Sequence, residues 1–216
     1  MEPRQPSATK ARILEAARAL FNEEGVGALS AVDIAAALGI SPGHLYYHFR
    51  GKPEILAVLA DAYQDEVRLV LDAALQACRG DGATLETLWT HVHILVEEAW
   101  DARFLHREAG ALALRYHDLA ARLRRIGAAE REALRTMLAS LAEAGAIAGP
   151  AEALDGLARV LVTAIAFHAL ELELEGDPGP PRALIARAAA QVMGLVAAYA
   201  VSPPPGLSGT SRRARP

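Results

Sequence analysis

The sequence predicts an all-α protein, and three observations favour that fold class. Alanine, leucine, glutamate and arginine dominate the composition, and all four are good helix formers. Runs of β-branched residues are few, and aromatic side chains make up only 5% of the chain. Apolar residues recur at helical spacing in long segments that Gly and Pro separate. With 52% hydrophobic residues among 216, the chain can bury a sizeable core.

A short helix is predicted to begin near Ala31. Ser30 and Asp33 stand three positions apart, so the side chain of each can bind the backbone amide of the other, which is the pattern of a helix N-cap. Ile34 and neighbouring apolar residues supply one buried face. Gly39 ends the helix after about two turns, because glycine adopts the left-handed conformation without steric cost.

A second short helix follows at once. Ser41 can cap it, and Pro42 stands at its first position, where the missing amide hydrogen costs nothing. Two short helices joined by a tight turn that contains glycine are typical of the helix-turn-helix motif, whose second helix lies in the major groove of DNA. The sequence therefore predicts a DNA-reading helix that begins at Pro42.

The residues of this second helix divide into a buried and an exposed set. At about 100° per residue, Leu45 and Phe49 fall on one face and are expected to point inward. The opposite face is aromatic and hydrogen-bonding, which suits contact with base edges and phosphates. We expect base contacts from Gly43, His44 and Tyr47, and phosphate contacts from Tyr46, His48, Lys52 and Ser30, with Ser41 and Pro42 at the start of the helix completing the candidate DNA-binding residues.

The pattern formed by Asp33 to Ala35, Leu38 to Ser41, Gly43 to Phe49, and Lys52 resembles the N-terminal domain of the TetR family of regulators. Residues from Ile13 to Gly25 are similar to the first helix of that domain. The resemblance implies three N-terminal helices followed by an all-helical ligand-binding and dimerisation domain. The expected organisation is a DNA-binding domain at 8–52, an effector-binding and dimerisation domain at 53–201, and a disordered tail at 202–216.

One further stretch carries a resemblance of its own. Residues Arg103 to Glu108, followed by Asp118 to Arg122, are similar to a branch of the same family whose ligand is not characterised.

The charge of the chain is not that of an obvious nucleic-acid binder. The net charge is −4 and the isoelectric point is about 6.0. Between Thr9 and Lys52 the sequence has five basic and four acidic side chains. Few phosphate contacts per subunit are therefore expected, and the loss of DNA affinity with added salt should be gentle.

Beyond the predicted DNA-binding domain, the apolar spacing and the Gly and Pro breaks predict six further helices. The first begins at Pro53. The second begins at Ala83 or Thr84 and ends near Trp100. The other four span 104–114, 118–144, 151–175 and 182–201. The last two have wide apolar faces with many alanines, which favours packing against a second copy of the chain in a homodimer.

The unusual side chains of these helices are the candidate effector-pocket residues that the resemblance implies. A mostly apolar cavity with few polar groups suggests an uncharged or singly anionic hydrophobic effector. Its binding would act on the DNA-binding domain through the helix that begins at Pro53. The candidates are Trp89, His93, Trp100, Phe104, His106, Tyr116, Met137, Phe167 and His168.

Several classes of protein are disfavoured. The single Cys78 cannot form an internal disulfide and the N-terminus lacks the apolar core of a signal peptide, so a cytoplasmic protein is expected. The longest apolar run, Val160 to Phe167, is far shorter than the about 20 residues of a membrane helix. His44 and His48 lack a third ligand nearby, and the cluster of His91, His93, Glu97 and Glu98 is expected to be a salt-bridged or solvated polar face, so neither a metal nor another cofactor is expected.

The leading hypothesis is a homodimeric transcriptional regulator, not an enzyme. It would act most simply as a repressor that binds double-stranded DNA at a palindromic operator and leaves it when a small molecule binds. A helical-bundle enzyme or ligand carrier with a degenerate DNA reader is the alternative, and the sequence does not separate a repressor from an activator.

Overall fold

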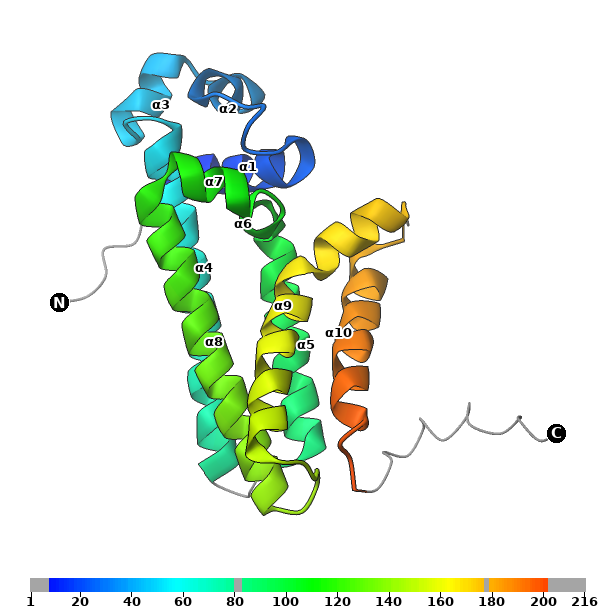
Figure 1. Cartoon of the computed structure of the whole chain (residues 1–216). Coiled ribbons are helices and arrows are strands. Elements are labelled where there is room, and N and C mark those ends of the chain that lie inside the picture. Colours follow the sequence, from blue (N-terminus) through cyan, green and yellow to red (C-terminus); the bar gives the residue numbers. More distant parts are fainter. Residues whose placement is uncertain (1–7, 80–82, 177–178, 202–216) are drawn as a thin grey trace. The chain divides into compact units, whose positions relative to one another are not determined.

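The protein is described here by a computed structural model that covers residues 8–79, 83–176 and 179–201. Every regular element in those ranges is a helix (Figure 1), so the prediction of an all-α fold is confirmed. The chain divides into two compact units. The first consists of Met1–Val67 with Glu98–Ile126, and the second of Arg68–Glu97 with Gly127–Pro216.

The first unit contains the predicted helix-turn-helix. Its elements are α1 (Ala8–Glu24), α2 (Ala31–Ala37), α3 (Pro42–His48), the start of α4 (Lys52–Arg79), the end of α5 (Leu85–Asp101), α6 (Arg103–Arg107), α7 (Ala109–Arg115) and the start of α8 (His117–Glu143). The predicted start of α2 at Ala31, its end before Gly39 and the predicted start of α3 at Pro42 are confirmed. Their core consists of fully buried apolar side chains, among them Ile13, Phe21, Ile34 and Leu45.

The predicted helix over 104–114 is wrong in one respect, because the structure has two short helices there. Glu108 stands between α6 and α7 with φ −105° and ψ 16°, outside helical geometry. Its carboxylate accepts hydrogen bonds from the backbone amides of Val26 and Gly27. These partners lie more than 80 positions away in the sequence, so local spacing could not show the break.

The second unit is built on long helices. It contains the remainder of α4, α5 and α8, together with α9 (Ala151–Glu175) and α10 (Pro181–Ala197), which lie side by side (Figure 1). Gly145, at φ +73°, ends α8 at the predicted position. The core of this unit includes Leu134, Leu138, Leu161 and Val192, each at most 2% exposed.

The last helix ends at Ala197 and not at Val201 as predicted. After Ala197 the chain turns and lies against the segment that follows α8. The amide of Ala148 donates to the carbonyl of Tyr199 at 2.8 Å, and the amide of Val201 donates to the carbonyl of Ala146 at 3.1 Å. These bonds satisfy the backbone of the last residues better than fraying helical turns would.

Helix α9 contains a stretch, Ala151–Leu172, that is long and apolar enough to cross a membrane, with a mean hydropathy of 1.5. Within the described residues, 39% of this stretch is buried inside the chain. Cys78 is half-buried near the end of α4, and burial raises the pKa of its thiol. The expected tail at 202–216 lies outside the described residues.

Candidate nucleic-acid interface

The start of α2 is fixed by a reciprocal cap. The Asp33 carboxylate accepts from the Ser30 amide at 2.8 Å and from the Ser30 hydroxyl at 2.6 Å. In return the Ser30 oxygen accepts from the amide of Asp33 at 3.3 Å. These bonds favour the ionised carboxyl and lower the pKa of Asp33. The Ser30 hydroxyl, a predicted phosphate contact, is therefore already engaged in holding the helix.

Helix α3 begins at a defined angle to α2. Gly39 adopts φ +65° in the turn, where an L side chain would be strained. Ser41 accepts a hydrogen bond from the amide of His44 at 3.2 Å, and Pro42 occupies the first turn. The local sequence therefore determines where the second helix starts, as predicted from Ser41 and Pro42.

The two faces of α3 differ as the helical spacing predicted. Leu45 is fully buried and Phe49 is 3% exposed, so both belong to the core. Tyr47 is 85% exposed and Tyr46 is 49% exposed, and His44 is also exposed. A tyrosine ring exposed to this degree on a short capped helix leaves its hydroxyl available to a partner.

The aromatic rings of α3 contact one another on the exposed side. The Tyr47 and His48 rings meet edge to face with centroids 5.1 Å apart, and the His44 and His48 rings are 5.3 Å apart. A Cβ added at Gly43 would meet only the Ser41 oxygen, at 4.0 Å, so this part of the helix surface is open. The structure thus brings the predicted residues of α3 together on one surface.

Lys52 has a use that the sequence did not indicate. Its ammonium donates to the carbonyls of Val26 at 2.7 Å and Leu29 at 2.6 Å, both in the loop between α1 and α2. Partial burial lowers the pKa of the lysine. The predicted phosphate contact of Lys52 would therefore share the ammonium with this loop.

Three residues, which we name the α6 clasp, join α1 and the loop after it to the segment around α6: Asn22, Arg107 and Glu108. Glu108 accepts from the amide of Val26 at 2.6 Å and from the amide of Gly27 at 3.1 Å. Arg107 donates to the carbonyls of Phe21 at 3.0 Å and Asn22 at 3.2 Å, at the end of α1. The clasp thereby satisfies backbone groups at the end of a helix and in the following loop.

Asn22 is the buried member of the α6 clasp, at 8% exposure. Its side chain donates to the carbonyl of Asp101 at 2.8 Å and accepts from the amide of Phe104 at 3.1 Å. One side chain of α1 thus joins the end of α5 to the start of α6. Sequence reasoning missed this role, although the stretch from Arg103 to Glu108 had been singled out as a pattern.

The pattern of residues also matches known proteins. Residues 13–59 match the family model described as bacterial regulatory proteins of the tetR family. Residues 63–203, more than half of the chain, match the TetR model described as a bacterial transcriptional repressor. The chain belongs to the TetR family. Membership supports a DNA-binding transcriptional regulator and not the enzyme or carrier alternative.

Curated transcriptional regulators are similar to this TetR-family chain over about a quarter of its length. The transcriptional regulator TtgR of Pseudomonas putida is 37% identical over 57 residues, 26% of this chain and 27% of that protein. The transcriptional regulator UidR of Escherichia coli is 40% identical over 60 residues, 28% of this chain and 30% of that protein. The matches therefore span less than a third of these relatives.

The fold is shared over nearly the whole length. A solved TetR-family transcriptional regulator from Marinobacter aquaeolei VT8 superposes with a TM-score of 0.77 at 28% identity, over 89% of this chain and 91% of that one.

In this TetR-family protein, four of the predicted effector-pocket residues belong to the first unit. The Phe104 ring packs on Phe21 with centroids 5.6 Å apart. The His106 Nε2 and the Tyr63 hydroxyl form a hydrogen bond of 3.0 Å. Trp100 lies under the Arg103 guanidinium at 4.7 Å, and Tyr116 lines a pocket of about 150 Å³ beside α4. Most of these side chains thus have packing or hydrogen-bonding partners within the unit.

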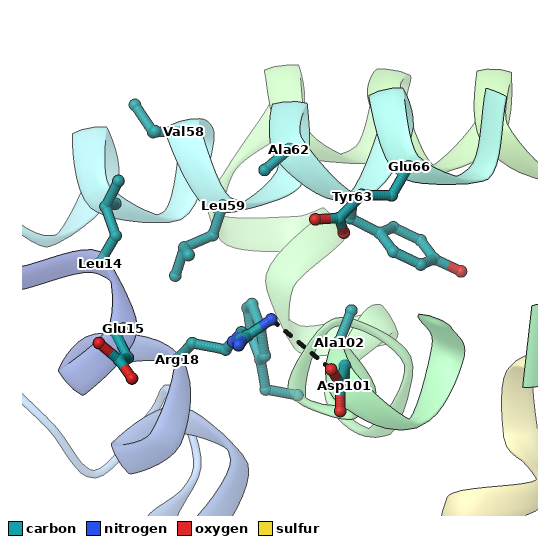
Figure 2. A pocket seen from close by; sticks show the side chains of 11 residues that line it. Leu14, Glu15, Arg18, Val58, Leu59, Ala62, Tyr63, Glu66, Asp101 and Ala102 are labelled. Carbon is teal, nitrogen blue, oxygen red and sulfur yellow. Dashed lines mark ion pairs between the residues drawn. The ribbon is translucent and has the colours of Figure 1, made fainter. Parts of the chain in front are cut away.

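A pocket of about 270 Å³ in the first unit lies between α1, α4 and the α5–α6 junction (Figure 2). Of the predicted effector residues only Phe104 lines it. Arg18 and Asp101 point toward each other at its edge, with a charged-atom separation of 3.7 Å (Figure 2). Its lining is mostly apolar, and Glu15, Arg18, Glu66 and Asp101 are its charged members.

The other predicted effector residues belong to the second unit. Met137 is 2% exposed, whereas Trp89 and Phe167 are 39% and 42% exposed. His168 is buried at 4% exposure, and its Nδ1 donates to the Ile165 carbonyl at 2.6 Å. Desolvation lowers the pKa of His168 below its ordinary value. Within the described ranges no three His, Cys, Asp or Glu side chains gather as a metal site would require.

Proposed function

We propose that this TetR-family protein is a cytoplasmic, homodimeric repressor that binds a palindromic operator through α3 and releases it when a small molecule binds. The observation that carries the proposal is the exposed ring of Tyr47 on a helix that Ser41 and Pro42 fix at its start. A rigid, capped helix with hydrogen-bonding side chains on its exposed face has what major-groove recognition requires. The proposed repressor activity rests on the matching family model, which is described as a bacterial transcriptional repressor.

The roles of the residues follow from their places on α3. Gly43, His44 and Tyr47 lie at the exposed face and would contact base edges. Tyr46, His48, Ser30 and Lys52 would position phosphates, and Ser41 and Pro42 would stand closest to the backbone at the start of the helix. The open space over Gly43 would allow the duplex to approach the helix closely.

Dimerisation supplies the second reading helix. Val160 and Phe167 of α9 and Leu195 of α10 are exposed apolar side chains on two neighbouring helices, at 51%, 42% and 38% exposure. Burial of such side chains against a second copy would stabilise a dimer. A two-fold pair of α3 helices would then read half-sites about 34–36 Å apart, one helical turn of DNA.

We expect the α6 clasp to transmit effector binding to α2 and α3 within the first unit. Glu108 accepts from the loop that ends at the Ser30 cap of α2, and Arg107 donates to the end of α1 before that loop. An effector that favours a conformer with α6 displaced would shift that loop, and α2 and α3 with it. A coupling of about 1–3 kcal/mol between the two binding events suffices for regulation.

The experiment that tests the proposal is selection of duplexes from a randomised DNA pool by the purified protein, with Tyr47→Ala and Tyr47→Phe beside it. We expect enrichment of an inverted repeat. Tyr47→Ala should lose about 1–3 kcal/mol of specific binding, and Tyr47→Phe should show how much of that loss belongs to the hydroxyl.

The matched control is Leu69→Ala, which removes an apolar side chain that is 65% exposed on α4 in the second unit. It should enrich the same repeat as the wild type. No enrichment by the wild type, or equal operator affinity in Tyr47→Ala, would refute the proposed reading surface.

A further inference from the structure

The larger pocket of the first unit, between α1, α4 and the α5–α6 junction, is separate from the surface that reads DNA. We name it the α1–α4 pocket. None of its lining residues belongs to α2 or α3, and all of them belong to the first compact unit. Its volume of about 270 Å³ is slightly below the about 300–1,000 Å³ of typical small-molecule sites. The pocket therefore has room for a small ligand.

The inner surface of the α1–α4 pocket is apolar. Leu59, Tyr63 and Phe104 line it and are buried, and Leu14 and Val58 beside them are half-buried. In Figure 2, Leu59 extends from α4 into the space between the helices, and Arg18 extends into the same space from α1. An apolar group placed between these helices would be removed from water on both sides.

The charged side chains of the pocket are unequal in sign. Glu15, Glu66 and Asp101 supply three carboxylates, Arg18 supplies one guanidinium, and the difference is two negative charges. Arg18 pairs with Asp101 at 3.7 Å. Glu15 and Glu66 are exposed, and in the described part of the chain no hydrogen bond or ion pair engages either carboxylate. Because exposed carboxylates are ionised at pH 7, the pocket should attract a cation and repel an anion.

The buried Glu130 of α8 differs from these carboxylates. It is 4% exposed, and burial raises its pKa to about 8, so it is neutral at pH 7. It lines neither of the two pockets described above. The α1–α4 pocket, in contrast, combines room for a ligand with exposed carboxylates at its edge.

We propose that the α1–α4 pocket binds a small molecule with an apolar body and a protonated amine, and that this binding lowers the affinity of the protein for its operator. The effect on DNA rests on the proposed function. The apolar body would lie against Leu59, Tyr63 and Phe104. Glu15 and Glu66 would favour the ammonium group over a neutral or anionic head group.

Helix α1 connects the pocket to the DNA-reading helices. It lines the pocket with Leu14 and Arg18, it buries Ile13 and Ala17, and it contacts both α2 and α6. An ammonium group in the pocket would compete with Arg18 for the carboxylate of Asp101. Helix α1 would then lose an ion pair to the end of α5, and α2 would move with α1.

The test uses two series of probes, each with one apolar body and three head groups. They are 1-naphthylmethylamine, 1-naphthalenemethanol and 1-naphthoate, and hexylamine, hexanol and hexanoate. Binding to the full-length protein is measured by calorimetry at pH 7. In at least one series the amine should bind at least about tenfold more tightly than the carboxylate, with the alcohol between them. Absence of amine binding at millimolar concentration, or equal binding of amine and carboxylate, would overturn the proposal.

The double variant Glu15→Gln/Glu66→Gln removes the two excess charges at exposed positions, so it should fold. The preference for the amine over the carboxylate should fall below about threefold. The matched control is Glu23→Gln/Glu143→Gln, which neutralises two exposed carboxylates outside the pocket, near the end of α1 and at the end of α8. It should keep the preference of the wild type. A full preference in the Glu15→Gln/Glu66→Gln protein contradicts the proposed selection.

The variant Ala62→Trp tests where the probes bind. Ala62 is an exposed residue of α4 that lines the pocket, so an indole there would fill the space. Amine affinity should fall at least about tenfold. Ala73→Trp, at an exposed position of α4 outside the pocket, should bind the amine as the wild type does. Amine binding that survives in Ala62→Trp would exclude the α1–α4 pocket.

The operator obtained by duplex selection links the site to regulation. An amine concentration that saturates the wild type should lower its operator affinity at least about fivefold, and should leave that of Ala62→Trp unchanged. An unchanged operator affinity of the liganded wild type would refute the regulatory role. Amine binding without selective DNA binding would refute the regulator and leave the ligand site, whereas selective DNA binding without amine binding would refute the ligand site alone.

Discussion

Gly25 meets two requirements at once, and only glycine meets both. Its φ of +88° lies in the region that L side chains rarely adopt. A Cβ at this position would also lie 2.7 Å from the Glu108 Oε1 atom. The position thus combines a backbone constraint with the space that the α6 clasp needs to reach the loop amides.

Gly25→Ala is expected to lower the free energy of unfolding by about 2–3 kcal/mol, through backbone strain and displacement of the Glu108 carboxylate. Urea unfolding of the purified protein measures the loss. Gly127→Ala is the control, because Gly127 lies in α8 and a Cβ there would meet nothing within 4 Å. It should gain up to about 1 kcal/mol from higher helix propensity. Equal effects of the two changes would contradict this account.

Glu130 predicts a dependence of stability on pH. Its pKa is raised from 4.5 to about 8 in the folded chain, so between these values the native state binds more protons than the unfolded state. The contribution of the Glu130 carboxyl to the free energy of unfolding is therefore fully present below pH 4.5 and is lost as the pH rises through 8. Glu130→Gln has no such proton to lose.

The free energy of unfolding of Glu130→Gln, relative to the wild type, should increase steadily from pH 5 to pH 8. Comparing the two proteins cancels every other titrating group. Glu143→Gln should show a constant difference from the wild type. A difference between Glu130→Gln and the wild type that does not change with pH would show that the carboxyl is compensated in solution.

At the level of helices, the sequence predicted α2 and α3 well because their determinants are local. The Ser30 and Asp33 cap, the left-handed Gly39, and the Ser41 cap all act within four residues of the helix ends that they define. The division between α6 and α7 was not predictable in this way. It depends on bonds from Glu108 to Val26 and Gly27, which lie 82 and 81 positions away.

Helix α4 begins at Lys52, whose ammonium binds the loop before α2 and is also a proposed phosphate contact. The salt dependence of DNA binding distinguishes these two roles. Lys52→Met removes the donor to the carbonyls of Val26 and Leu29, and should cost about 1–3 kcal/mol of unfolding free energy. Operator affinity should fall equally at all salt concentrations, because the loop that leads to α2 loosens. If the ammonium instead contacts a phosphate, the salt dependence should weaken by about one counterion per subunit. Arg12→Met, at an exposed position on α1, is the control, because it also removes one positive charge.

For the whole molecule, the sequence predicted that α9 and α10 carry wide apolar faces, and the structure shows how those faces are used. Leu157, Leu161 and Ile165 of α9 and Leu184 and Val192 of α10 are buried within a single chain. The exposed apolar residues of these helices are a different set. Helical spacing identifies an apolar face, but it does not tell which part packs inside the chain and which remains for a partner.

Val160→Glu is expected to weaken the homodimer. A carboxylate in place of a side chain that is 51% exposed on α9 would be buried without a partner on association. Sedimentation velocity should show a shift from dimer toward monomer, and operator affinity should fall with it. Leu69→Glu, at an exposed position on α4, should remain dimeric. A dimeric Val160→Glu protein would exclude this part of α9 from the interface.

The α6 clasp has a consequence for the order in which the protein is made. Glu108 stands at the midpoint of the 216-residue chain, and the partners of the clasp are separated by 79 to 86 positions. The ribosome releases the N-terminal segment first. Helices α2 and α3 are therefore complete in the nascent chain while the loop before them still lacks its acceptor, the Glu108 carboxylate. The amides of Val26 and Gly27 in the loop before α2 and α3 find their acceptor only when half of the polypeptide has been synthesised.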